Sequence, residues 1–128
     1  MSKFLISKCL RFLQKHWLSI TLFNLLMITT LSLWPVDQLP EAPGSDKTHH
    51  LLAYALLMFP AALAHPRRWL LQGLFFIGWS GAIELIQPHM NRYGEWADMA
   101  ANIAGVVMGY SLAWLSARCI PRLDLSKD

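Results

Sequence analysis

Apolar residues are gathered into four long blocks along the chain, instead of the narrow stripes typical of helices in soluble proteins. The blocks are residues 17–34, 50–64, 69–87 and 97–117. Each has close to, or slightly fewer than, the roughly 20 residues that cross a hydrocarbon core about 30 Å thick. We therefore predict an all-α, polytopic membrane bundle of four transmembrane helices, with a kink or tilt at Pro60 in the second.

The 128-residue chain is 55% hydrophobic and 15% charged, a composition that suits one membrane domain. We expect this domain at residues 17–117, between a basic N-terminal arm (1–16) and a short tail (118–128). The first apolar block is longer than a signal core and no small-x-small site follows it cleanly, so we interpret it as an uncleaved helix. Cys9 and Cys119 have no C-x-x-C spacing and are expected to be free thiols.

Lysine and arginine residues are distributed unevenly over the predicted loops. The N-terminal arm holds four, the turn at Arg67 and Arg68 holds two, and the tail holds three. Only Lys47 and Arg92 lie in the other two loops. Because basic residues favour the cytoplasmic side, both termini and the middle turn are predicted to be cytoplasmic. The net charge of +3 then reflects membrane topology, and we expect no nucleic-acid partner.

Ionisable and amide side chains lie near the same predicted end of the second, third and fourth helices. Such groups are costly at membrane depth, roughly 2.5–3.5 kcal/mol each on insertion scales, and they usually have a function there. We call this set the outer cluster, and its members are Lys47, His50, Glu84, Gln87, Arg92, Asp98 and Asn102. We predict that these side chains share one outward-facing pocket.

The fourth predicted helix carries its polar and small residues on one face. At about 100° per residue, Asp98, Asn102, Gly105 and Gly109 lie within a stripe roughly 60° wide. Ala101, Gly105 and Gly109 also form a small-x-x-x-small row, which allows another helix to approach closely. Helix packing explains the glycines but does not account for Asp98.

Two further residues at the start of the second helix have an ordinary structural interpretation beside a functional one. Asp46 suits either a helix N-cap or the polar site. Tyr54, one turn beyond His50, suits either an interfacial aromatic residue or the site.

In their order and spacing, these residues resemble the VanZ-like family of small bacterial membrane proteins. The resemblance runs from about Asp46 to Gly109, roughly half the chain, and all seven residues of the outer cluster match the family pattern. It implies a multi-pass protein of the bacterial inner membrane and a link to tolerance of glycopeptide antibiotics such as teicoplanin. It does not imply a molecular activity, because family membership is not a mechanism.

The chemistry of the outer cluster favours an anionic ligand. Lys47 and Arg92 can hold a phosphate or carboxylate, and His50 can move a proton as acid or base, oriented by Glu84 or Asp98. An envelope lipid or lipid-linked precursor has a suitable headgroup, and whether it is bound or modified is left open. The other candidate ligand-binding residues are Asp46, Tyr54, Gln87 and Asn102. We expect the lipid tail in an apolar groove beside Gly81, Ala101, Gly105 and Gly109.

Three alternatives remain at this point. His50, Glu84 and Asp98 are candidate ligands of a divalent metal, but one histidine with scattered carboxylates is a weak metal pattern, and we expect no metal or cofactor. The second alternative is a proton-coupled small transporter. The third is a membrane scaffold in which salt bridges to Lys47 or Arg92 hold the helices of the bundle together. A scaffold role implies a homo-oligomer or another membrane protein as partner.

Overall fold

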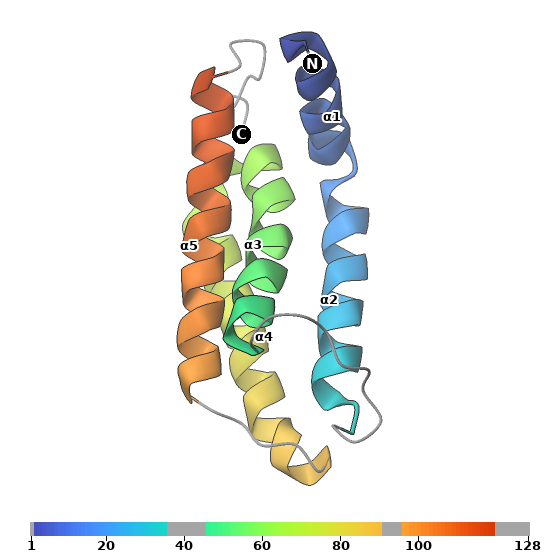
Figure 1. Cartoon of the computed structure of the whole chain (residues 1–128), viewed down its shortest axis with the longest axis vertical. Helices are drawn as coiled ribbons and strands as arrows, with labels where there is room; N and C mark the ends of the chain where they lie inside the picture. Colours follow the sequence, from blue (N-terminus) through green and yellow to red (C-terminus); the bar gives the residue numbers. More distant parts are fainter. Residues whose placement is uncertain (1, 36–45, 91–95, 120–128) are drawn as a thin grey trace.

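The computed structural model describes residues 2–35, 46–90 and 96–119, and these segments are helical, as predicted. The α-helices are α1 (Lys3–Lys15), α2 (Trp17–Leu33), α3 (Asp46–Ala64), α4 (Trp69–Ile86) and α5 (Trp96–Cys119). Short 3-10 helices, η2 (Pro66–Arg68) and η3 (Gln87–Met90), flank α4. Helices α2 to α5 run alternately in opposite directions along the chain, and α1 lies at the same end of the bundle as the end of α5 (Figure 1).

The segment that we predicted as a basic arm is the helix α1. It contains neither proline nor glycine and is rich in Leu, Lys, Gln and Arg, which are good helix formers. A bend of 73° separates α1 from α2. At the bend, His16 leaves helical geometry (φ −106°, ψ 20°) while its N–H still bonds the Phe12 carbonyl at 3.0 Å.

Helix α3 lies at the centre of the bundle, in contact with all four other helices. Leu57, Met58 and Ala61 of α3 have no exposed surface. Its most extensive contact is with α5, where the two helices run in the same direction (Figure 1). Because neighbouring helices cover it, α3 can begin with a polar turn and still bury its apolar residues.

Amide side chains from three neighbouring helices satisfy backbone carbonyls of α3. Pro60 has no N–H, so the carbonyl of Leu56 lacks its usual donor, and Asn24 of α2 donates to it at 3.4 Å. The last carbonyls of a helix also lack intrahelical donors. Near the end of α3 the Leu63 carbonyl accepts from Gln14 of α1 at 2.8 Å, and the Ala61 carbonyl accepts from Gln72 of α4 at 3.0 Å in addition to the His65 N–H.

Two helical units in the described segments are long and apolar enough to cross a membrane, namely Pro66–His89 and Trp96–Cys119. The bent pair of α1 and α2 makes a third if it is counted as one span. The outer surface of α4 fits lipid contact, since Leu71, Leu74 and Leu85 are 63–77% exposed. By length and hydropathy the structure therefore has two or three candidate spans, and α3 is not among them.

Candidate functional site

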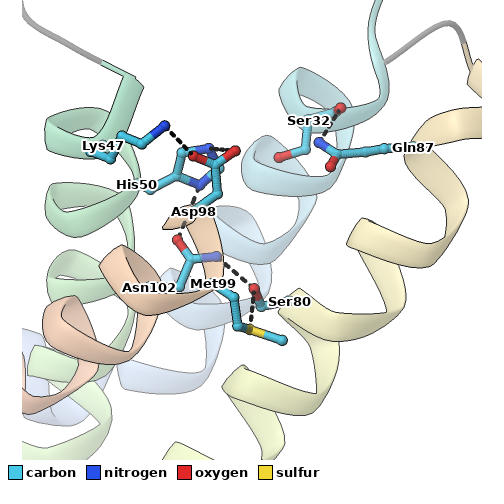
Figure 2. A network of polar contacts seen from close by, with 8 residues as sticks. All are labelled: Ser32, Lys47, His50, Ser80, Gln87, Asp98, Met99 and Asn102. Atoms are coloured by element: carbon cyan, nitrogen blue, oxygen red, sulfur yellow. Dashed lines mark hydrogen bonds and ion pairs between the residues drawn. The ribbon is translucent and has the colours of Figure 1, made fainter. Parts of the chain in front are cut away.

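A connected network of polar side chains lies where α3 and α5 begin, at the end of the bundle opposite α1 (Figures 1 and 2). Lys47 Nζ is 3.4 Å from Asp98 Oδ1, and His50 Nε2 is 3.6 Å from Asp98 Oδ2. The other ring nitrogen, His50 Nδ1, is 3.0 Å from Asn102 Oδ1. Four members of the outer cluster are thus joined, with Asp98 between the two basic side chains.

Close contact between α3 and α5 places these side chains within reach of each other. A Cβ atom added to Gly105 would meet the carbonyl oxygen of Leu51, and one added to Gly109 would lie 2.6 Å from that of Ala55. The α5 backbone therefore lies directly against α3. Asp98, two turns before Gly105, is in the first turn of α5, where the positive end of the helix dipole favours a carboxylate.

The network continues inward to α4. Asn102 Nδ2 donates to Ser80 Oγ, and the Ser80 hydroxyl donates to Met99 Sδ at 3.5 Å (Figure 2). Ser80 and Asn102 are only 1% and 2% exposed. The polar path therefore leads from the rim of the bundle into its core.

The polar contacts fix the orientation of the His50 ring. Because Asn102 Nδ2 donates to Ser80, Asn102 Oδ1 faces His50 Nδ1, which suits a proton on that nitrogen. His50 Nε2 then faces Asp98 Oδ2.

Exposure decreases steeply across the ion pair. The Lys47 side chain is 48% exposed, whereas that of Asp98 is 11% exposed. Asp98 Oδ1 accepts no hydrogen bond within the described segments, and its contact with Lys47 is an ion pair only. A cation at the rim is thus held by a carboxylate that is itself largely withdrawn from solvent.

Of the other predicted site residues that the structure describes, Gln87 has its partner on another helix. Gln87 is buried, and its Nε2 donates to the Ser32 carbonyl of α2 at 3.1 Å (Figure 2). Glu84 is half-buried on α4. Tyr54 is buried at 2% exposure, so its interpretation as an interfacial aromatic residue is wrong. Arg92 and the side chain of Asp46 lie outside the described residues.

The expected groove for a lipid tail does not form beside Gly105 and Gly109, because α3 covers both glycines. Ala101 is half-buried on the same helix. A surface recess of about 380 Å³ lies instead farther along α5, lined by Tyr110, Ser111, Trp114 and Leu115.

The divalent-metal alternative finds no support in the arrangement of side chains. Across the segments that the structure describes, no three His, Cys, Asp or Glu side chains are grouped closely enough to hold a metal ion. His50, Glu84 and Asp98 therefore do not form the metal site that we considered.

Sequence reasoning missed three partners in these contacts. Ser80 lies one turn before Glu84 on α4, and this helical spacing was a usable signal. Met99 follows Asp98, and nothing in its position distinguishes it from a packing residue. Ser32 takes part through its backbone carbonyl, which side-chain patterns do not indicate.

No protein-family model matches the chain, and the comparisons with curated proteins and with solved structures likewise give no match. The assignment of a function therefore depends on the residues and their geometry.

Proposed function

We propose that this chain is a VanZ-like multi-pass protein of the bacterial inner membrane that binds an anionic lipid headgroup at Lys47. The headgroup belongs to an envelope lipid or a lipid-linked precursor, which gives a physical route to altered tolerance of glycopeptide antibiotics. The resemblance in order and spacing supports the family, and the polar network at the bundle end supports the site.

The observation that carries the proposal is the half-exposed Lys47 ammonium held 3.4 Å from the largely buried Asp98 carboxylate. An ammonium group is a compact point charge that suits phosphate. Asp98 restricts the position of the Lys47 ammonium at the rim, and His50 lies on the other side of Asp98 as a candidate acid or base. Both charge signs and a histidine therefore lie at one end of the bundle.

Four membrane-spanning helices remain our proposal, although α3 does not meet the hydropathy criterion for a span. Helix α3 has 19 residues, close to the roughly 20 that cross a bilayer. Most of its surface faces other helices, and its large exposed side chains, Leu52 and Leu56, are apolar. The polar turn that lowers its hydropathy is the turn that carries Lys47 and His50.

The transporter alternative is less favoured by the position of the polar groups. Binding sites of secondary transporters usually lie near the bilayer midplane, between broken helices. Here Lys47 and Asp98 lie at helix ends. In the described segments the network reaches inward through Asn102 and Ser80, which are joined by a hydrogen bond.

Lys47→Gln is expected to weaken headgroup binding by about tenfold, because the charge that pairs with phosphate is lost. Purified protein in a neutral detergent would be titrated with dihexanoyl phosphatidylglycerol and, as a neutral control, dihexanoyl phosphatidylcholine. The ¹⁵N resonances of the His50 ring and of the amides near Lys47 would report binding at this site. Lys47→Arg, which keeps the charge, should bind within a few fold of the parent. Equal affinity of Lys47→Gln and the parent would refute the site.

The four-span topology predicts the side on which each loop lies. Reporter fusions after residues 66 and 128 should be cytoplasmic, whereas fusions after residues 44 and 94 should be exported, because nine of the eleven basic residues lie in the N-terminal arm, the middle turn and the tail. Paired alkaline phosphatase and fluorescent protein fusions would measure this. An exported fusion at Pro66 would contradict the topology without bearing on headgroup chemistry.

A further inference from the structure

Helix α1 has an inner face that is fixed to the bundle. Ser7 and Leu10 are buried, and Gln14 on the same face donates to the Leu63 carbonyl of α3 at 2.8 Å. These residues are spaced three and four apart, so one stripe of the helix makes the contacts. The opposite surface of α1 has no partner helix among the described segments.

That outer face combines positive charge with large apolar side chains. Phe4, Leu5, Ile6 and Phe12 are 40–60% exposed, which is unusual for a helix that meets only water. The basic residues of the helix are Lys3, Lys8, Arg11 and Lys15. Residues 1–16 contain no aspartate or glutamate, so nothing within this segment offsets the charge.

We propose that the outer face of α1 binds an anionic phospholipid surface, with the helix lying in the headgroup region beside the transmembrane bundle. A basic amphipathic helix with aromatic and aliphatic side chains is suited to that position. The 73° bend turns α1 away from the direction of α2, so α1 does not simply extend the span. At the bend, Trp17 packs edge-on against His65 at 4.9 Å between ring centroids, which fixes the junction to the end of α3.

Charge at this end of the bundle favours anionic lipid over a second copy of the protein. Arg67, Arg68 and Arg118 are exposed at the same end (Figure 1), and the described acidic residues lie at the other end. Two copies that met through α1 would bring at least eight basic side chains together, which is repulsive. Anionic headgroups neutralise them, while Phe4 and Phe12 enter the boundary of the acyl chains.

The side chains of α1 are already arranged for such a surface. Lys8 Nζ lies 4.7 Å from the centre of the Phe4 ring, and Arg11 donates to Ser7 Oγ at 2.9 Å. Lys8 and Lys15 are exposed and lie off the stripe of Ser7, Leu10 and Gln14, so changes at both are not expected to disturb the contact with α3. This site is independent of the one at Lys47, which lies at the opposite end.

A reporter at Cys9 tests the proposal in the full-length protein. Cys9 is an exposed free thiol on α1, and a Cys119→Ser background leaves it as the single labelling site. An environment-sensitive dye on Cys9 would be followed in nanodiscs of phosphatidylcholine alone and with phosphatidylglycerol added. Spin-labelled lipids would measure contact with the bilayer by quenching. We expect quenching to increase with phosphatidylglycerol and to decrease with added salt.

Lys8→Gln combined with Lys15→Gln should lower the ratio of lipid-bound to free α1 by about 25-fold, roughly fivefold for each lysine. Lys8→Arg with Lys15→Arg keeps the charge and should behave like the parent, and equal melting temperatures would show that both double variants are folded. Quenching that is the same in both lipid mixtures and in the glutamine variant would overturn the proposal. Self-quenching between dyes on two copies would also overturn it, because the face would then be a protein interface.

Discussion

Gly105→Ala is expected to lower the free energy of unfolding by about 3 kcal/mol, at the upper end of what overpacking costs. The added Cβ would meet the Leu51 carbonyl oxygen and lie 3.0 Å from Tyr54 Cβ. A backbone carbonyl in a helix cannot move aside as a flexible side chain can, so α3 and α5 must separate. The His50–Asn102 contact of 3.0 Å would then be lost as well. Thermal unfolding in detergent and the folded yield from membranes would measure the effect.

Gly78→Ala is the matched control for this experiment. Gly78 is an exposed residue in the interior of α4, and no atom lies within 4 Å of an added Cβ. Alanine favours a helix over glycine by about 0.5–1 kcal/mol, so this variant should be as stable as the parent or slightly more stable. If Gly105→Ala and Gly78→Ala unfold at the same temperature, α3 and α5 do not pack through Gly105.

Asp98→Asn is expected to leave the bundle folded and to increase the affinity for a simple phosphate headgroup by up to about fivefold. The carboxylate lies 3.4 Å from Lys47 Nζ and competes with a bound anion for that charge. Lys47 is half exposed, so the ion pair is screened and contributes at most about 1 kcal/mol. The amide also removes the cost of burying a charge, and its oxygen can still accept from His50 Nε2. Thermal unfolding and the phosphatidylglycerol titration would measure both effects.

The same variant separates a binding site from a structural lock. Breaking a buried ion pair that holds a bundle together typically costs about 3–5 kcal/mol, while replacing both partners by apolar residues is often nearly neutral. A large loss of folded Asp98→Asn protein, recovered in a Lys47→Met, Asp98→Leu double variant, would therefore show that the ion pair has a structural role. Opposite changes in affinity for Lys47→Gln and Asp98→Asn, with both proteins folded, would decide for the binding site.

Local pattern was enough to predict most helices. The apolar blocks at 17–34, 69–87 and 97–117 correspond closely to α2, α4 and α5, because length and hydropathy are properties of a continuous segment. Helix α1 was missed because its residues were considered only as charges for topology. The helical spacing of Ser7, Leu10 and Gln14 was present in the sequence, but its meaning depends on α3 being there to receive that face.

The prediction of the candidate site depended both on local sequence pattern and on how the helices pack. Periodicity alone put Asp98, Asn102, Gly105 and Gly109 on one face, and all four are buried on α5. Which residues they meet was decided by the contact of the two glycines with the α3 backbone, which has no signature in the α3 sequence. Gln87 had the same apparent depth as Asp98, yet it contacts Ser32.

The sequence by itself determined that this chain is helical, where α2 to α5 begin and end to within a few residues, and that its polar residues gather at one end. These properties follow from apolar run lengths and from the 3.6-residue period, which act within one segment. Only the tertiary structure decided that α3 is central, that Asp98 lies between Lys47 and His50, and that Ser80 joins the network. Those outcomes depend on how closely and at what rotation helices pack, and that is set by side chains distant in the sequence.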